Sequence, residues 1–586
     1  MDPGRGQERP DLESPPSGAD GGRRQRSPRF RLPLGTPLIW HIVSLLVGAL
    51  FLMYVNRNQW FFGDEWDFLA NRSVGVGTGS LFQPHNEHWS TSPMLIYGLL
   101  FRLTGLSSYA PYVAALVLAN LAVVHLMWRV MLRGGVGPWI ATAFCAAFIP
   151  FGPGAEDLLW AFQIGFVGSV ALGLAFVLLA DRDGRFGGRD VAGWGVGVLG
   201  LTFSGISVPL IGMAGLAAWL RRGFLAALVT ISVPIAAFLA WFALAGSVSV
   251  TAHPSITSDS LRLFPQFVGR GLGAVLSWGT GTPLVGVFAL ALTVGSLVIR
   301  HRAGRSMPTA ALASAAGGLL VTVLLAVARA PLGVELAESS RYVYIGAALF
   351  LPLSLIGVSD LAGRRLVATF LVAAVAVPWA VQNGRELVHK ASLQADRERL
   401  IREQIVAAGT VFAAAELLRD RPEPVYSPDL DLVELELLLP RLPRGVTPSR
   451  EALTRAALAL QFSLTSEPSF QSSVPVSGLR AFHASLVVGA DGCAEASADG
   501  SQPRLLVPAF ESSSLGVHTT DALELEFLLS AGELRPDYGE RFEVGAGETW
   551  FINTAMDEMI VGRATLIVRF PSRITICPVD ASAAER

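Results

Sequence analysis

Charged residues, cysteine and lysine are all scarce in this chain of 586 residues. Only 16% of the residues are charged and the formal net charge is −2, whereas an average soluble protein carries roughly a quarter charged residues. The chain therefore has no field that would attract a nucleic acid, and its three cysteines exclude a disulfide-dense scaffold and a zinc ribbon. Lys390 is the only lysine, and this near-total use of arginine is typical of a GC-rich bacterial genome. Apolar residues are in excess, at 51%, which predicts a polytopic α-helical membrane protein.

Signatures of soluble enzymes are also missing. The sequence contains no GxxxxGK[ST] phosphate loop, HExxH, CxxC or nucleophile elbow. Gly195, Gly197 and Gly200 do spell GxGxxG, but they lie inside an apolar run rather than after a strand. Close packing of helices explains these glycines better than nucleotide binding does.

Long runs without charge predict the membrane spans. Residues 37–55 contain no charge and no small-residue cleavage site, so we predict an uncleaved first span; a cleaved signal peptide is the alternative. Further runs of about span length lie at 103–128, 134–155, 158–180, 223–258, 271–299, 306–328, 342–359 and 366–384.

The run 191–220 is too long for one span, and Ser204, Gly205, Ser207 and Pro209 interrupt its middle. We predict a tight hairpin of two helices here, because the arginine clusters on both sides of the run should face the cytoplasm. The transmembrane domain, residues 37–384, then has about eleven spans in the cytoplasmic membrane. Its amino terminus is predicted to lie inside and its carboxyl terminus outside.

Three segments flank this domain. Residues 1–36 are rich in Pro, Gly, Ser and charge, which predicts a disordered cytoplasmic segment. Residues 385–420 are charged and predict an amphipathic connecting helix that leaves the membrane. Residues 421–586 alternate apolar segments with Gly, Pro and Asp turns, which predicts a mainly β extracytoplasmic domain with helical stretches near 429–439 and 450–462.

The cysteines divide between these regions. Cys493 and Cys577 lie in the predicted extracytoplasmic domain, where an oxidising environment allows a disulfide between them; two free thiols are the alternative. Cys145 lies in a predicted span, where it is expected to pack as a small apolar residue.

The informative region is the first extracytoplasmic loop, residues 56–102. It contains WFFGDEWDF at 60–68, in which Asp64, Glu65 and Asp67 lie among aromatic rings. Acids near a membrane are costly without a function, and a carboxylate beside apolar rings can act as a general base toward a hydroxyl group. The aromatic rings also offer flat faces to sugars. The alternative is a solvated loop whose aromatic residues belong to the interfacial belt.

The order of these features resembles the GT-C superfamily of membrane glycosyltransferases, which includes protein mannosyltransferases and the aminoarabinose transferase of lipid A. A cytoplasmic amino terminus, one span and a large outer loop that opens with an acidic pair carry the resemblance. It continues through the segment HNEH at 85–88 and the short apolar helix predicted after Ser92, and covers roughly residues 37–385. Such enzymes use polyprenyl-phosphate sugars as donors.

The resemblance implies roles for particular residues. Asp64 matches the catalytic acid, which acts as a base or orients the acceptor hydroxyl, and Glu65 matches the second member of the acidic pair. Arg341 and Tyr342 lie where members hold the donor phosphate, which a guanidinium can grip with two hydrogen bonds. The alternative is a boundary arginine that reaches lipid headgroups. Arg262 and Arg270 are weaker phosphate candidates.

Two further groups of residues are candidates from the pattern alone. A divalent cation near the leaving phosphate could be held by His85, Glu87 and His88, although two histidines three residues apart also occur by chance. The acceptor cavity is predicted to be lined by Trp66, Asp67, Glu156 and Asp157. Glu156 and Asp157 could equally be acids at a favourable helix amino terminus.

We therefore predict transfer of a sugar from a polyprenyl-phosphate donor to an extracytoplasmic acceptor, which could be a cell-envelope glycan, lipid or protein. The alternatives are a transporter or flippase of lipid-linked glycans and a noncatalytic envelope scaffold. A transporter should carry ionisable residues at mid-membrane depth, whereas these spans are nearly free of them. An enzyme requires Asp64, His88 and Arg341 to converge in one outward cavity.

Overall fold

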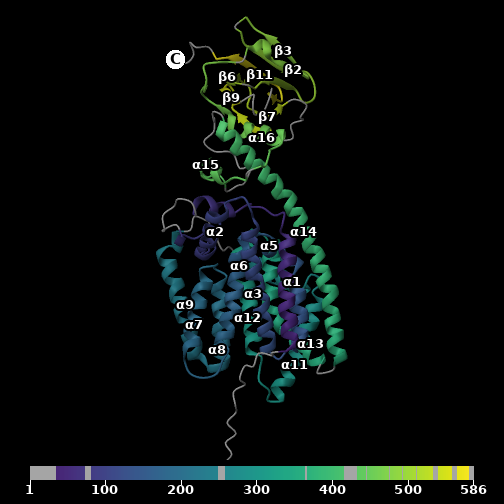
Figure 1. The fold of residues 1–586 in the computed structure, drawn as a ribbon. Coiled ribbons are helices and arrows are strands. Elements are labelled where there is room, and N and C mark those ends of the chain that lie inside the picture. The colour runs from purple at the N-terminus through teal and green to yellow at the C-terminus, as the bar shows by residue number, and fades with distance from the viewer. Residues whose placement is uncertain are drawn as a thin grey trace, which may run out of the picture.

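The computed structural model describes residues 35–72, 81–248, 258–362, 366–414 and, with short gaps, 430–579. A helical bundle carries a β-sandwich at one of its ends (Figure 1). We call this end of the bundle the sandwich end. The predicted disordered segment 1–36 lies outside the described residues, apart from Gly35 and Thr36.

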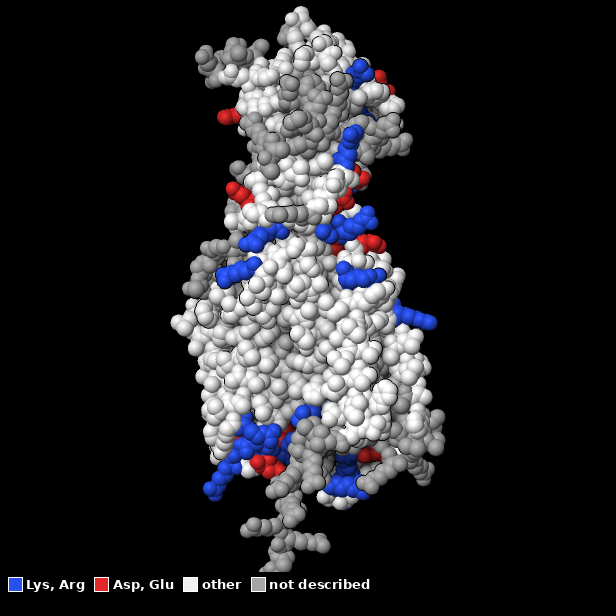
Figure 2. Space-filling view, in the orientation of Figure 1, with Lys and Arg blue, Asp and Glu red and all other residues white. Residues whose placement is uncertain are grey.

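Within the described residues, seven helical segments are long and apolar enough to cross a bilayer. They are Thr36–Val55 (α1), Ala110–Arg133 (α3), Ala161–Ala180 (which contains α6, Ile164–Ala180), Phe224–Leu244 (α9), Leu284–Arg302 (α11), Thr309–Leu332 (which contains α12, Thr309–Arg329) and Ser340–Ala362 (α13). Figure 2 shows charged side chains gathered toward the two ends of the bundle, with a broad band between them almost free of charge. This is a multi-pass membrane protein, but a count of about eleven spans is not confirmed.

Three shorter helices complete much of the bundle: Pro138–Phe148 (α4), Gly188–Leu201 (α7) and Ser207–Arg222 (α8). α7 and α8 confirm the hairpin predicted over 191–220. A Cβ atom added at Gly197 would lie 2.8 Å from the Phe176 ring, so this glycine of the GxGxxG pattern allows α7 to pack closely on α6.

The prediction of one span over 271–299 is wrong. The run is divided between an amphipathic helix, Ser258–Ser277 (α10), and α11. Gly279 and Gly281 lie between them with φ angles of +76°, a backbone conformation that glycine adopts readily. The chain therefore turns inside a charge-free run, which composition alone does not reveal.

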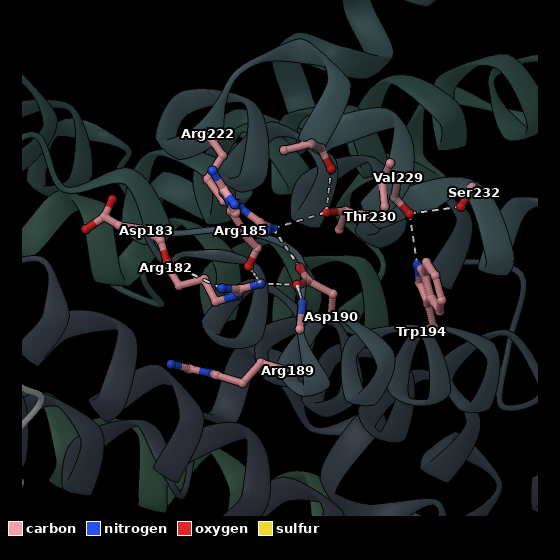
Figure 3. A network of polar contacts seen from close by, with 12 residues as sticks. Arg182, Asp183, Arg185, Arg189, Asp190, Trp194, Arg222, Val229, Thr230 and Ser232 are labelled. Atoms are coloured by element: carbon pink, nitrogen blue, oxygen red, sulfur yellow. Dashed lines mark hydrogen bonds and ion pairs between the residues drawn. The ribbon is translucent and has the colours of Figure 1, made fainter.

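Arginines at the end opposite the sandwich pair with buried acids that join the helix ends. Asp190, at the start of α7, accepts hydrogen bonds from Arg182 and from Arg222, the latter at 2.8 Å (Figure 3). Asp181, at the end of α6, pairs in the same way with Arg133 and Arg221. Removing either acid would leave guanidinium groups without their counter-charge in a partly buried site.

The helix α14, Leu366–Ala414, is 49 residues long and runs along the bundle before it reaches the sandwich (Figure 1). Its second half is helical over the range predicted for the connecting helix, 385–420, as far as Ala414. Glu398 on this half is buried and accepts a hydrogen bond of 2.5 Å from the backbone N–H of Trp60. Because Trp60 belongs to the first loop, α14 ties that loop to the segment that carries the sandwich.

Two antiparallel sheets form the sandwich, with strand orders β1-β9-β6-β11-β4-β3 and β2-β5-β10-β7-β8. Apolar residues alternate along the strands, as at Leu525, Phe527 and Leu529, and both sheets bury them in one shared core. The strands are Phe462–Thr465 (β1), Arg480–Phe482 (β2), Ala484–Val488 (β3), Ala494–Ala498 (β4), Arg504–Pro508 (β5), Glu511–His518 (β6), Leu523–Ala531 (β7), Gly539–Val544 (β8), Thr549–Met556 (β9), Ala564–Arg569 (β10) and Arg573–Pro578 (β11).

Two helices precede the sandwich, Leu432–Leu438 (α15) and Arg450–Gln461 (α16). The Ser449 hydroxyl accepts a hydrogen bond from the Ala452 N–H at 3.2 Å and caps α16. The predictions of a mainly β region and of helical stretches near 429–439 and 450–462 are confirmed.

Cys493 and Cys577 form the predicted disulfide, which joins residues 84 positions apart. We expect Cys493→Ser to lower the free energy of unfolding of the sandwich by about 2–4 kcal/mol, because the disulfide restricts the unfolded chain. Thermal unfolding of the full chain, with and without a reductant, measures this. The buried Cys145 provides the control Cys145→Ala. If reductant or Cys493→Ser left the unfolding of the sandwich unchanged, the disulfide would not stabilise it.

Candidate active site

The first loop leaves α1 at Val55 and is anchored by buried aromatic side chains. Phe61 packs edge-on against Tyr109 and Tyr112, with ring centroids 4.7 and 4.8 Å apart. Trp66 is fully buried and lies against Phe61 and Trp60. These contacts hold the chain rigidly on both sides of Asp64. Trp66 is therefore part of the core, and the prediction that it lines an acceptor cavity is wrong.

Glu65 is also fully buried, and it is not among the residues that line the cavity beside Asp64. Its carboxylate accepts hydrogen bonds from Tyr97 Oη at 2.5 Å, Tyr109 Oη at 2.9 Å and the Phe62 N–H at 3.0 Å. Burial raises the pKa of Glu65 to about 7, although these hydrogen bonds oppose the shift. The structure places Glu65 behind the loop as a residue that holds it, not among the groups that face the cavity.

Asp64 faces the other way, and its side chain is 33% exposed. Its carboxylate accepts a hydrogen bond from Asn86 Nδ2 at 3.3 Å and lies 3.8 Å from His85 Nε2. The other ring nitrogen of His85, Nδ1, lies 2.6 Å from Asp67. Burial lowers the pKa of His85, but the hydrogen bonds and charges of Asp64 and Asp67 outweigh it and raise the pKa above its usual value. Asp67 thus orients His85 toward Asp64 rather than lining a cavity.

The segment 85–88 is a tight turn that presents its side chains beside Asp64. The backbones of His85 and His88 exchange hydrogen bonds of 3.0 and 2.8 Å, and Asn86 and Glu87 both have positive φ angles, +43° and +73°. Two such angles in the middle of a turn are typical of type I′.

Burial, followed by the charge of Arg329, lowers the pKa of His88 to about 4, so His88 is neutral at pH 7.

The predicted cation site is not supported by this arrangement. Glu87 faces Arg329, with Oε2 3.6 Å from the guanidinium, and His85 is engaged by Asp67. In the described part of the chain, no three His, Cys, Asp or Glu side chains lie close enough to share a metal ion.

A cavity of about 620 Å³ opens between this loop and the sandwich ends of several helices. Its inner part is apolar and is lined by Phe166, Val208, Phe238 and Leu325, from α6, α8, α9 and α12. Its polar part is lined by Asp64, His85, Asn86, Glu87, His88, Arg329, Arg341 and Tyr342. Asp64, His88 and Arg341, which are far apart in the sequence, therefore meet in one cavity.

Two arginines face this cavity from neighbouring helices. Arg341, at the start of α13, lies 3.5 Å from Glu156 and its side chain is 32% exposed. Arg329, at the end of α12, pairs with Glu87 at 3.6 Å. Such long ion pairs leave guanidinium N–H groups available for an anionic ligand. Arg329, which directly follows the charge-free run 306–328, is not among the site residues predicted from the sequence. The signal was available: an arginine at a span end predicted to face outward departs from the positive-inside rule.

The remaining candidates lie outside the cavity lining. Glu156 belongs to the short helix Glu156–Leu159 (α5) and contacts the cavity through Arg341. Asp157 is fully buried, and burial raises its pKa well above the usual value. Arg270 on α10 faces Glu335 at 3.7 Å. Neither it nor Arg262 is among the residues that line the cavity.

The chain is similar to two solved structures of ArnT from Cupriavidus metallidurans, one bound to undecaprenyl phosphate and one in the apo state. Each is 14% identical to this chain and covers 73% of it, with a TM-score of 0.43; the match covers 93% and 92% of the respective ArnT chains. No family model matches the chain, and no curated protein matches it.

Proposed function

We propose that this protein is a membrane glycosyltransferase that moves a sugar from a polyprenyl-phosphate donor to an acceptor hydroxyl on the extracytoplasmic side. The observation that supports it most is the composition of one cavity: its lining combines a carboxylate, Asp64, with two guanidinium groups, Arg329 and Arg341, and with many apolar side chains. An acid that can accept a proton, cations that can hold a phosphate and an apolar wall for a lipid chain are the groups that this reaction needs.

In the proposed reaction the acceptor oxygen attacks the anomeric carbon of the donor sugar. The acceptor hydroxyl gives its proton to Asp64, and the bond between the anomeric carbon and the phosphate oxygen breaks. Polyprenyl phosphate leaves with the bonding electrons, and Arg341 and Arg329 stabilise the negative charge that it gains. His85, held by Asp67, keeps Asp64 oriented toward the acceptor.

The proposed function also requires a particular orientation in the membrane. The amino terminus lies in the cytoplasm, and the sandwich end, with the cavity and the β-sandwich, lies outside the cytoplasmic membrane. The arginine-rich opposite end then faces the cytoplasm, as the positive-inside rule requires. A cell-envelope glycan, lipid or protein can reach the cavity only from the outer side.

The decisive experiment is turnover of a panel of polyprenyl-phosphate sugars by the purified protein in nanodiscs, with release of polyprenyl phosphate as the readout. We expect at least one donor to be consumed in the presence of an acceptor mixture from the cell envelope. If no donor is bound or consumed, while lipid-linked glycans cross the membrane of vesicles that contain the protein, the transporter alternative is correct.

Arg341→Ala should reduce kcat/KM for the donor by about 10- to 100-fold, because hydrogen bonds to a charged group contribute about 1.5–3 kcal/mol. KM should rise because Arg341 binds the donor phosphate already in the ground state, and kcat should fall because the negative charge that Arg341 stabilises grows in the transition state. Arg57→Ala is the matched control, since Arg57 lies at the end of α1 and contacts Tyr54. An unchanged KM for Arg341→Ala would remove Arg341 from the donor site.

A further inference from the structure

A second hollow, of about 720 Å³, opens on the outer surface of the bundle between α1 and α14. Its floor is apolar and includes Phe51 of α1 and Val381, Gly384 and Val388 of α14. Its rim carries Arg385 and His389. Figure 1 shows α1 and α14 running alongside each other at the edge of the bundle. The lining of this groove shares no residue with the lining of the active-site cavity.

Gly384 keeps the groove open. Glycine is, after proline, the least favourable residue in the interior of a helix, and Gly384 lies well inside the 49-residue α14. Close packing does not explain it, because an added Cβ atom would meet only Phe51 Cζ, at an ordinary contact distance of 3.8 Å. A larger side chain at this position would instead fill the floor of the groove.

The rim offers hydrogen-bond donors above this floor. Arg385 and His389 lie one helical turn apart and therefore on the same face of α14. Among the described residues neither forms an ion pair, whereas the adjacent Lys390 pairs with Glu386 at 2.7 Å and donates to the Gly152 carbonyl. An arginine at the edge of a membrane can lay its stem along apolar surface and extend its guanidinium to a headgroup.

We propose that this groove binds one anionic glycerophospholipid. An acyl chain lies along Phe51, Val381, Gly384 and Val388, and the headgroup phosphate accepts hydrogen bonds from Arg385 and His389. The two parts of the groove match the two parts of such a lipid, and the positive rim selects an anionic headgroup over a zwitterionic one.

The position of the groove links the bound lipid to the loop that carries Asp64. α1 ends at Val55 and leads directly into that loop. The loop is held to α14 through Gln59, whose Nε2 donates to the Ala391 carbonyl at 2.9 Å, and through the Trp60 N–H, which donates to Glu398. A lipid bound between α1 and α14 therefore stabilises both helices, which support the first loop.

Binding is tested by titrating the full-length protein in detergent with phosphatidylglycerol or phosphatidylcholine of identical chains and following bound lipid by native mass spectrometry. The wild type should bind one phosphatidylglycerol about tenfold more tightly than phosphatidylcholine, because both lipids carry the phosphate but only phosphatidylcholine brings a cationic choline group to the positive rim. Gly384→Leu should lose the tight binding of either lipid, and Arg385→Gln should lose the preference for phosphatidylglycerol. Gly295→Leu is the matched control, because Gly295 is likewise a helix-interior glycine with open space around it.

The outcomes separate clearly. Equal affinity of the wild type for the two lipids overturns the headgroup site, and wild-type phosphatidylglycerol affinity in Gly384→Leu overturns the groove. If Gly384→Leu does not fold, Arg385→Gln and His389→Gln still decide the matter, since both alter exposed side chains. An increase in thermal stability on adding phosphatidylglycerol, absent in Arg385→Gln, supports the link to the loop. None of these readouts depends on glycosyl transfer.

Discussion

Asp64→Asn should reduce the rate of sugar transfer by ~10²- to 10⁴-fold, the usual effect of removing a general base. The amide keeps nearly the same shape but cannot accept the acceptor proton at neutral pH. Because the Asp64 side chain is partly exposed and its contacts with Asn86, at 3.3 Å, and His85, at 3.8 Å, are both long, the loop should keep its structure. Single-turnover transfer by the purified variant, together with donor affinity by equilibrium binding, measures the two properties separately.

The matched control for Asp64→Asn is Asp183→Asn, which removes an acid whose side chain is 61% exposed, near the arginines of the opposite end. It should transfer sugar at the wild-type rate. If Asp64→Asn turned over as fast as an active wild type, Asp64 would not be the base. If it bound donor much more weakly, Asp64 would contribute to donor binding instead.

The short-range sequence pattern predicted the helix hairpin over 191–220 and the strands of the sandwich, because both depend on the order of neighbouring residues. Ser204, Gly205, Ser207 and Pro209 interrupt an apolar run, and two helices with a turn between them are the result. Strands such as Leu523–Ala531 follow from the alternation of apolar and polar residues. The prediction of one span over 271–299 is wrong because the absence of charge indicates an apolar environment but not the direction of the chain. Its turn depends on Gly279 and Gly281, two glycines among the 60 of the chain.

In the candidate site, too, some features could be predicted from the sequence and others depend on tertiary packing. An enzyme requires Asp64, His88 and Arg341 to converge, and all three line one cavity. Which neighbours of Asp64 would join it was not predictable, because side-chain direction depends on tertiary packing. Glu65 and Trp66 follow Asp64 directly in the chain, yet both are fully buried. Arg329 joins the cavity because α12 ends where α13 begins, at the sandwich end of the bundle, and no short motif predicts this arrangement.

Glu65→Ala should lower the free energy of unfolding by roughly 3–9 kcal/mol, because it leaves three buried donors without an acceptor and each such loss amounts to about 1–3 kcal/mol. The donors are the hydroxyls of Tyr97 and Tyr109 and the N–H of Phe62. The first loop should loosen as well, so transfer should fall in parallel with stability. Thermal unfolding in detergent and protease cleavage of the loop measure the two effects.

Glu65→Gln and pH distinguish a holding role from a catalytic one. The amide keeps a carbonyl acceptor for the two tyrosines, so its loss of stability should be clearly smaller than that of Glu65→Ala. Burial raises the pKa of Glu65 to about 7, above its value near 4.3 in an unfolded chain. Between these pH values the folded protein holds a proton that the unfolded chain has released, so wild-type stability should fall as pH rises through this window. Glu65→Gln cannot titrate and should lose stability less steeply there. If Glu65→Gln were as stable as the wild type at pH 7 yet as slow in transfer as Asp64→Asn, Glu65 would take part in the chemistry, as the acidic pair in the sequence first indicated.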